Sequence, residues 1–296
     1  MNLNYKWSNS ALTFCKVALF SLISFNALAF DSSGKILLTG GVSQIEGSAG
    51  GGLVPWAIIG GYETEDQIGF NAFHTNVNTS DYTLEAAGVL VGLYDRVELS
   101  YAKQSFNTQS VLLGLGFPQN FRIKQNVFGV KVKLTGDAVL EQDSFLPQIA
   151  VGAQYKQNEQ SFVGLAIGAK DKSGYDYYIS ATKILLNQSL LYTVNLRATK
   201  ANQLGILGYG GDKNENYQLR FEGSLAYLVC STLTVGTEYR QKTDNLSFAK
   251  EYDWSDYFIA WAPTKNISLT LAYARLGSIV GQDDQNGLYS SVQIGF

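Results

Sequence analysis

The strongest constraint on this chain is a strict alternation of apolar and polar side chains that recurs in many short segments. In residues 288–296, for example, Val292 and Ile294 fall on one face and Gln293 on the other, and residues 266–275 repeat the pattern. A period of two is that of a β-strand. Beyond the first thirty residues the chain has no run of 18 apolar residues, so no helix is expected to span a membrane.

The two faces of these strands differ in side-chain size as well as polarity. One face carries large apolar residues, whereas the other carries Ser, Thr, Gly, Ala and Gln. A soluble sandwich also alternates, but it fills its core with large inward side chains. A polar interior and an apolar exterior are typical of a transmembrane barrel. In hydrocarbon a sheet must also close, because every backbone polar group needs a partner.

We expect an all-β, transmembrane, antiparallel up-and-down barrel of about fourteen strands. The first strand is the weakest, because Gly40 and Gly41 interrupt it, and residues 36–52 are open to a second interpretation as a plug. Twelve or sixteen strands remain open, since bacterial barrels of one chain have even numbers. The expected strands are 36–45, 53–62, 66–76, 82–93, 97–107, 121–135, 145–155, 176–185, 189–200, 217–229, 233–241, 255–262, 266–276 and 288–296.

The connections between the expected strands alternate in length. Short turns are expected at residues 94–96, 187–188, 230–232 and 263–265. Longer polar connections are expected at 108–120, 156–175, 202–216, 242–254 and 277–287. Outer-membrane barrels have short turns on one rim and long loops on the other. We therefore expect the long loops to face the outside of the cell.

The amino-terminal segment, residues 1–29, reads as a secretory signal peptide. Lys6 and Lys16 precede an apolar run that is too short to span a bilayer, and residues 27–29 form a small-x-small cleavage site. Signal-dependent export then leaves residues 30–296 as a barrel in the outer membrane of a Gram-negative bacterium.

Composition excludes several classes of protein. Only 16% of the residues are charged, the formal net charge is −3 and the chain has a single His. Nucleic-acid binding is disfavoured because no Lys/Arg cluster is present. A site built from several His residues is impossible. Cys230 is the one Cys in the expected mature chain, so no intramolecular disulfide forms there.

Aromatic residues and the last strand agree with this location. Tyr and Trp residues, Trp56 among them, fall on the expected outward positions near strand ends, as in the aromatic girdles of barrels. Phe296 follows apolar residues at alternate positions, a pattern that resembles the carboxyl-terminal strand of Gram-negative outer-membrane barrels. The expected partners are outer-membrane lipid and, through the strand that ends at Phe296, the barrel-assembly machinery.

Several short segments along nearly the whole mature chain share one resemblance: residues 37–47, 49–56, 92–98, 129–133, 146–152, 180–183, 201–208 and 268–273. They resemble an uncharacterised proteobacterial family, domain-of-unknown-function family 3034. The resemblance implies an outer-membrane protein and supplies neither a substrate nor site residues.

The search for catalytic or cofactor motifs yields no site. The Gly cluster at residues 47–52 lacks the Lys-Ser/Thr of a phosphate loop, and residues 283–287 lack calcium-loop spacing. His74 is expected on the outward face near a rim, without a Ser in a recognisable catalytic setting. We therefore expect no enzyme, no cofactor and no metal.

The expected interior carries a small set of charges. Strand parity places five basic and three acidic residues there, an excess of two positive charges, and pairs Glu222 with Arg240 and Ser224 with Glu238 across the 230–232 turn. The candidate lumen-lining residues are Glu98, Lys131, Lys133, Arg197, Arg220, Glu222, Glu238 and Arg240.

The leading functional hypothesis is a passive channel or transporter for small solutes that favours anions. The alternative is a structural or surface-interaction barrel with a blocked lumen, in which the same charges brace the interior. A lipid-hydrolysing outer-membrane enzyme is a distant third hypothesis. The solute itself does not follow from the sequence.

Overall fold

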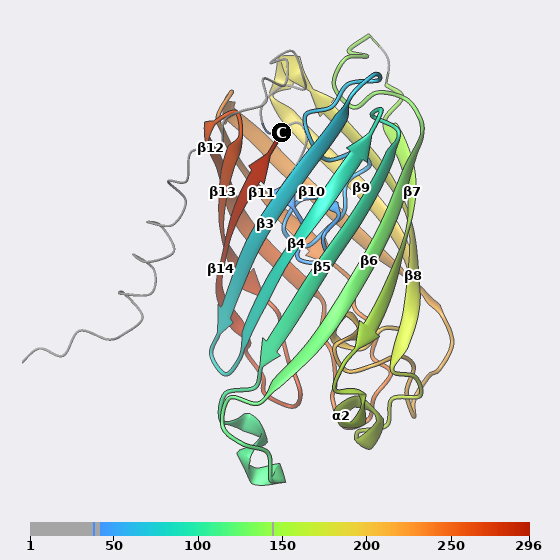
Figure 1. Ribbon diagram of the computed structural model, residues 1–296, viewed down its shortest axis with the longest axis vertical. Coiled ribbons are helices and arrows are strands. Elements are labelled where there is room, and N and C mark those ends of the chain that lie inside the picture. The colour runs from blue at the N-terminus through green and yellow to red at the C-terminus, as the bar shows by residue number, and fades with distance from the viewer. Residues whose placement is uncertain (1–37, 39–41, 144) are drawn as a thin grey trace, which may run out of the picture. The chain divides into compact units, whose positions relative to one another are not determined.

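Twelve antiparallel strands form a closed barrel in the computed structural model, which describes residue 38 and residues 42–143 and 145–296. Each strand pairs with its neighbour in sequence, and β14 pairs with β3 to close the ring (Figure 1). The strands are β3 (Ile68–Thr79), β4 (Thr83–Leu93), β5 (Val97–Asn107), β6 (Arg122–Thr135), β7 (Gln148–Asn158), β8 (Ser173–Leu185), β9 (Leu190–Thr199), β10 (Gln218–Cys230), β11 (Leu233–Arg240), β12 (Trp254–Thr264), β13 (Ile267–Arg275) and β14 (Asn286–Gly295).

The expected count of fourteen strands is wrong, and the two extra segments are 36–45 and 53–62. All of 53–62 lies inside the barrel, as do residues 42–45; residues 36–37 and 39–41 lie outside the described residues. Every residue from 42 to 61 is buried. In a wall strand one face stays exposed. This segment is surrounded by the wall on all sides, which is why none of its residues from 42 to 61 is exposed. The plug interpretation of 36–52 holds for its described residues.

The two rims differ as the turn chemistry predicts, with two exceptions. One rim, here the short-turn rim, carries the connections 94–96, 186–189, 231–232 and 265–266. It also carries one longer connection, 136–147. The opposite rim, here the long-loop rim, carries the longer connections 108–121, 159–172, 200–217, 241–253 and 276–285, and one short turn at 80–82. In Figure 1 the short-turn rim is at the top.

The outer face of the wall is apolar. Leu99, Ile179, Leu225 and Ile259 are between 45% and 52% exposed. A continuous apolar exterior of this kind is unfavourable in water and favourable in lipid. His74 also faces outward and is exposed, as expected from its position in β3. Among the described residues no helix has the length and apolarity required to span a bilayer.

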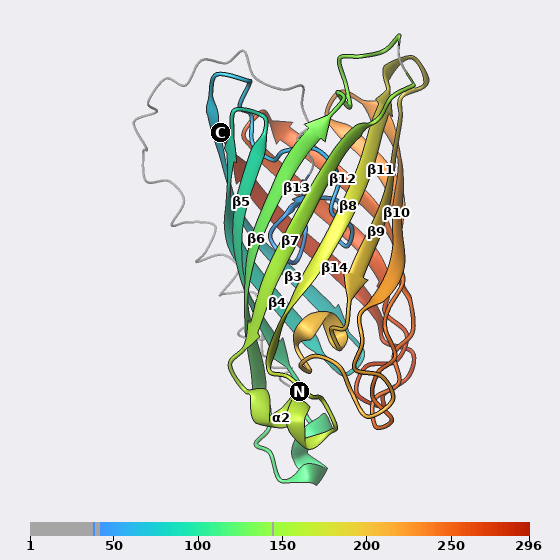
Figure 2. The same cartoon turned by 90° about the vertical axis from the view of Figure 1, so that its right-hand side faces the viewer.

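Residues 42–62, which we call the finger, fill the lumen from the short-turn rim. The finger folds back on itself, because β1 (Val42–Ser43) pairs with β2 (Ala49–Gly50). Leu38 shares a small cavity with wall residues at the short-turn ends of β8, β9 and β10, and Tyr62 donates its N–H to Phe296 O at 3.2 Å. Both ends of the finger therefore lie at the same rim. Figure 2 shows it in blue between the walls.

Candidate functional site

Side chains of the wall, and not a neighbouring strand, provide hydrogen-bond partners for backbone groups of the finger. Glu98 Oε1 accepts the Ala49 N–H at 3.1 Å, and Glu98 Oε2 accepts the Gly60 N–H at 3.0 Å. Glu238 Oε2 accepts the Leu53 N–H at 2.7 Å. Buried backbone groups need such partners. Two acidic wall residues thus hold the finger through its amides.

Lys131 holds the finger through its carbonyls. Its Nζ donates to Ala49 O at 3.0 Å, Trp56 O at 3.1 Å and Ile58 O at 2.7 Å, and forms an ion pair with Glu98 at 2.9 Å. Both charged side chains are 1% exposed. Removing one member of such a buried pair leaves the other charge uncompensated.

Other wall residues hold the finger with neutral hydrogen bonds. Ser224 Oγ accepts the indole N–H of Trp56 at 2.9 Å, so Trp56 points into the barrel. The expectation that Trp56 faces lipid is therefore wrong. Gly51 packs against the carboxylate of Glu238 so closely that a Cβ there would overlap it. A residue with a side chain at this position would separate the finger from the wall.

Glu46, at the folded-back end of the finger, is the only charged residue in residues 42–62. Its carboxylate lies among three cations, which we call the cradle: Lys156 of β7, Arg197 of β9 and Arg240 of β11. Lys156 is in direct ion-pair contact, Arg240 Nη1 lies at 2.7 Å and Arg197 Nη2 at 4.0 Å. All four side chains are at most 3% exposed.

Two wall carboxylates complete the cradle. Glu222 Oε1 lies 2.6 Å from Arg197 Nε and 3.0 Å from Arg240 Nε. Asp176 Oδ2 lies 2.5 Å from Lys156 Nζ. Three cations thus face two wall anions, and Glu46 supplies the charge that balances them.

Five of the eight candidate lumen residues fall into two groups. Glu98 and Lys131 pair near the short-turn rim, while Arg197, Glu222 and Arg240 gather toward the long-loop rim. The three others do not join either group.

Of those three, Glu238 binds the finger and accepts from Ser224 Oγ at 2.7 Å. Lys133 lies at the short-turn rim, where it pairs with Asp95 at 2.5 Å. Arg220 hydrogen-bonds Gln218 on its own strand. The expected pairings of Glu222 with Arg240 and of Ser224 with Glu238 are present. They assume that Val229 lies opposite Leu233, whereas Leu233 pairs with Cys230, because a bulge lies between Leu228 and Cys230.

Sequence reasoning missed Glu46, Lys156 and Asp176. Lys156 falls in the expected connection 156–175, although it lies in β7 and shares the parity of the inward residue Gln154. Asp176 likewise shares the inward parity of Ser180 in β8. The signal for Glu46 was its isolation as the one charge in an apolar, Gly-rich segment, because a lone buried charge requires partners.

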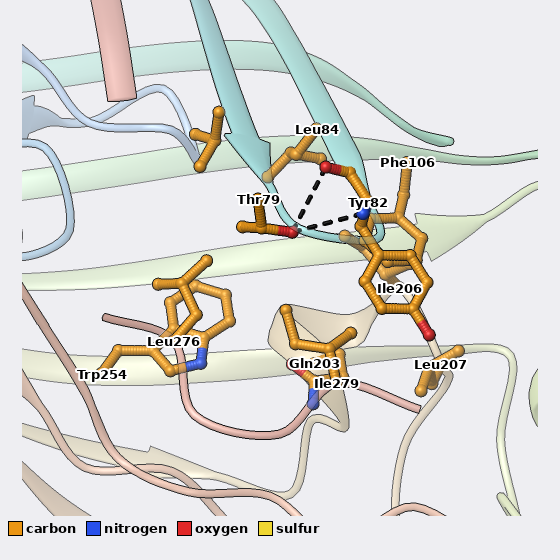
Figure 3. A pocket seen from close by; sticks show the side chains of 11 residues that line it. Thr79, Tyr82, Leu84, Phe106, Gln203, Ile206, Leu207, Trp254, Leu276 and Ile279 are labelled. Atoms are coloured by element: carbon orange, nitrogen blue, oxygen red, sulfur yellow. Dashed lines mark hydrogen bonds between the residues drawn. The ribbon is translucent and has the colours of Figure 1, made fainter. Parts of the chain in front are cut away.

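The inward-folded parts of the long loops cover the end of the finger; we call residues 201–211, 243–246 and 276–280 the loop layer. Gln125 links the two, donating to Leu204 O at 3.1 Å and to Gln104, which in turn donates to Ile45 O at 2.8 Å. Figure 3 shows the apolar packing of this region. A cavity of about 30 Å³ remains, lined mainly by apolar side chains such as Tyr82, Phe106, Ile206, Leu207, Trp254, Leu276 and Ile279.

One buried ion pair belongs to the loop between β11 and β12. Lys242 Nζ lies 3.0 Å from Glu251 Oε2 and 4.5 Å from the centre of the Trp254 ring. Burial lowers the pKa of Lys242, and the carboxylate of Glu251 opposes that change. Burial likewise raises the pKa of Glu251, opposed by Lys242 and by the Gln203 N–H. The pair fixes this loop against Gln203 of the loop layer.

Comparison with known proteins gives a family and a fold. The model of the family described as "Protein of unknown function (DUF3034)" matches residues 39–293. No curated protein matches the chain.

Among solved structures, a KdgM porin is similar with a TM-score of 0.50 and 10% identity over 76% of this chain and 99% of that one. A NanC porin has a TM-score of 0.48 and 13% identity over 77% and 98% of the two chains. Outer-membrane phospholipase A from Escherichia coli has a TM-score of 0.42 and 10% identity over 80% and 94%. At these identities the likeness concerns the fold alone.

Proposed function

Because the chain belongs to DUF3034, a family of unknown function, we propose its role from the geometry: an outer-membrane channel for small solutes, closed by the finger. The observation that carries the proposal is how the lumen is filled. Besides apolar contacts, the finger is held by side-chain hydrogen bonds and the ion pairs of Glu46, and water can replace these polar contacts when the finger leaves. The wall behind it is polar, like that of a water-filled barrel.

The outer face supports a location in outer-membrane lipid. Apolar side chains cover it, and the barrel has the fold of a porin. Phe296 continues the pairing of β14 with β3, donating its N–H to Phe70 O at 2.8 Å. We further propose that a signal peptide over residues 1–29, which lie outside the described residues, directs export. Assembly in the outer membrane then proceeds through the carboxyl-terminal strand. No reaction is assigned to His74 or to any other residue.

A disulfide between finger and wall tests the channel directly. A Cβ built at Gly47 lies 3.2 Å from the Ala102 Cβ, slightly below the roughly 3.5–4.5 Å of a disulfide. Because Gly47 has φ +97°, where a side chain is strained, Gly47→Ala is the control for that strain. Gly47→Cys/Ala102→Cys in a Cys230→Ser background holds the finger when oxidised and releases it when reduced. In planar bilayers we expect conductance steps from the reduced protein and silence from the oxidised protein, with each single-Cys variant as control.

Glu46→Gln gives a second route to the open state, since it removes the charge that the cradle holds. We expect more frequent opening than in the unmodified protein. Glu65→Gln is the matched control, because Glu65 is exposed beside the finger and loses the same charge. Silence from the reduced disulfide variant and from Glu46→Gln alike would contradict the channel.

The second candidate is a structural or surface-interaction barrel with a permanently blocked lumen. Its support is the burial of the Lys131–Glu98 pair, whose members are each 1% exposed. Withdrawal of the finger would remove the backbone groups that hydrogen-bond to this buried pair and leave both charged side chains short of partners, so the finger would stay in place. The same bilayer experiment separates the two candidates.

A further inference from the structure

The cradle has the composition of a carboxylate-binding site. Lys156, Arg197 and Arg240 come from three different wall strands and converge on one carboxylate, that of Glu46. Arg guanidinium groups bind carboxylates with a planar fork of N–H donors, and Lys adds a compact charge. The convergence of three long cationic side chains on one point is a built arrangement and not a solvated surface.

The charge of the wall makes this site incomplete without an anion. Asp176 and Glu222 neutralise two of the three cations, and both are already bound to them. One positive charge therefore remains when Glu46 leaves. A positively charged site in a narrow lumen attracts anions, because low-dielectric walls focus its field. Withdrawal of the finger consequently leaves a site suited to a replacement anion.

The cradle lies where a solute that enters from the long-loop rim would reach it first. Arg240 is the last residue of β11, and Arg197 lies near the end of β9 at the same rim. A solute that passes the loop layer reaches the cradle before it reaches the Lys131–Glu98 pair. Glu46, at the folded-back end of the finger, is thus the first part of the finger that an entering solute meets.

We propose that the cradle of Lys156, Arg197 and Arg240 is the binding site for the carboxylate of an acidic solute, and that Glu46 occupies it as an internal substitute. The solute displaces Glu46 and so favours withdrawal of the finger. This proposal rests on the proposed channel function and adds a class of solute to it. No covalent step is involved.

Glu46→Ala tests the site by removing the internal carboxylate. Acetate is titrated into the full-length variant in detergent, with chloride at equal ionic strength and neutral acetamide as controls, and thermal unfolding is followed by tryptophan fluorescence. We expect acetate to raise the unfolding midpoint by several degrees and to saturate. Unmodified protein should need more acetate for a smaller shift, because Glu46 competes for the cradle, and Glu46→Ala/Arg240→Met should lose the shift. An acetate effect equal to that of chloride overturns the proposal.

A second measurement covers the case in which Glu46→Ala does not fold. In the Gly47→Cys/Ala102→Cys protein with Cys230→Ser, the yield of oxidised disulfide reports whether the finger is in place. Glutarate, whose end reproduces the glutamate side chain, should lower the yield at least twofold relative to pentane-1,5-diol. Equal yields with the two compounds overturn the proposal.

The outcomes separate this inference from the channel on which it rests. Acetate binding together with silent bilayers contradicts the channel and retains the site. Conductance together with an absence of carboxylate-specific binding contradicts the site and retains the channel.

Discussion

The two ends of the lumen are closed by different kinds of interaction. From the short-turn rim to the cradle, the finger is fixed by charged and polar groups of the wall, such as Lys131 and Glu98. At the long-loop rim, the loop layer is held by apolar packing around Leu207 and Ile279 together with hydrogen bonds of uncharged groups, such as the one that Asn245 donates to Asn202. Buried polar contacts need exact partners, whereas apolar contacts need only shape and area. The two regions thus differ in charge: buried charged side chains of the wall hold the finger, whereas apolar packing and mostly uncharged hydrogen bonds hold the loop layer.

The largest expected effect comes from Lys131→Met, which should release the finger and spare the loop layer. The substitution removes three hydrogen bonds to finger carbonyls and leaves Glu98 buried without its cation. We expect a loss of about 3–5 kcal/mol in the free energy that holds the finger. Hydrogen exchange of the amides between residues 49 and 60 measures it.

Lys133→Met is the matched control for that prediction. Lys133 pairs with Asp95 at the rim, where both side chains are partly solvated. Its loss should cost about 1 kcal/mol or less and leave exchange in the finger unchanged. Equal effects of the two substitutions on exchange in the finger would show that Lys131 has no special role in holding the finger.

The next largest effect is expected for Leu207→Ala, the reciprocal change in the loop layer. Leu207 is 1% exposed, and its truncation should cost about 2–5 kcal/mol, because the cavity beside it grows. Protection of the amides in residues 201–211 should fall, while that of the finger persists. Leu113→Ala, at a residue that is 48% exposed, should change stability by about 0.5 kcal/mol or less. Joint loss of protection in finger and loop layer would refute their independence.

The smallest effect is expected outside the lumen, at Glu159. Hydrogen bonds from Lys103 and Asn126 lower the pKa of Glu159 below its ordinary value of 4.5, and solvent screens the interaction. A lowered pKa in the folded state stabilises the protein above the ordinary pKa, and this contribution is lost as the pH falls through the folded value. Glu159→Gln should therefore cost about 1 kcal/mol or less at pH 7.

Unfolding midpoints at pH 7 and pH 3 check this sign. The difference between Glu159→Gln and the unmodified protein should be smaller at pH 3 than at pH 7, because the contribution of the carboxylate is lost as the pH falls toward its lowered pKa in the folded chain. A difference that grows on acidification would contradict the assignment.

Alternation was sufficient to predict the wall, because one face of every wall strand meets lipid. Twelve of the fourteen expected strands are present, including β14, and the register that pairs Glu222 with Arg240 follows from one turn. Residues 53–62 of the finger were predicted to be a wall strand because they are as apolar as one and lie where a strand would be expected. Their environment is set by a wall that forms from residues far away in the sequence.

The site was predictable only in part for the same reason. Parity selected Arg197 and Arg240, but what they bind depends on where Glu46 arrives after the chain folds back. The loop layer was also missed, since residues 202–216 were expected to be a polar external loop and residues 201–211 are buried. Loop residues carry no periodicity that reports which way they fold.

The finger enters and leaves through one rim, and this has a topological consequence. A segment whose two ends share one opening is not threaded through the ring of strands, so its withdrawal requires neither a break in the barrel seam nor passage of a chain end through the pore. The finger can move out through that rim as a folded loop. The topology therefore allows closing and reopening to be reversible, and the contacts between the finger and the wall set how often each occurs.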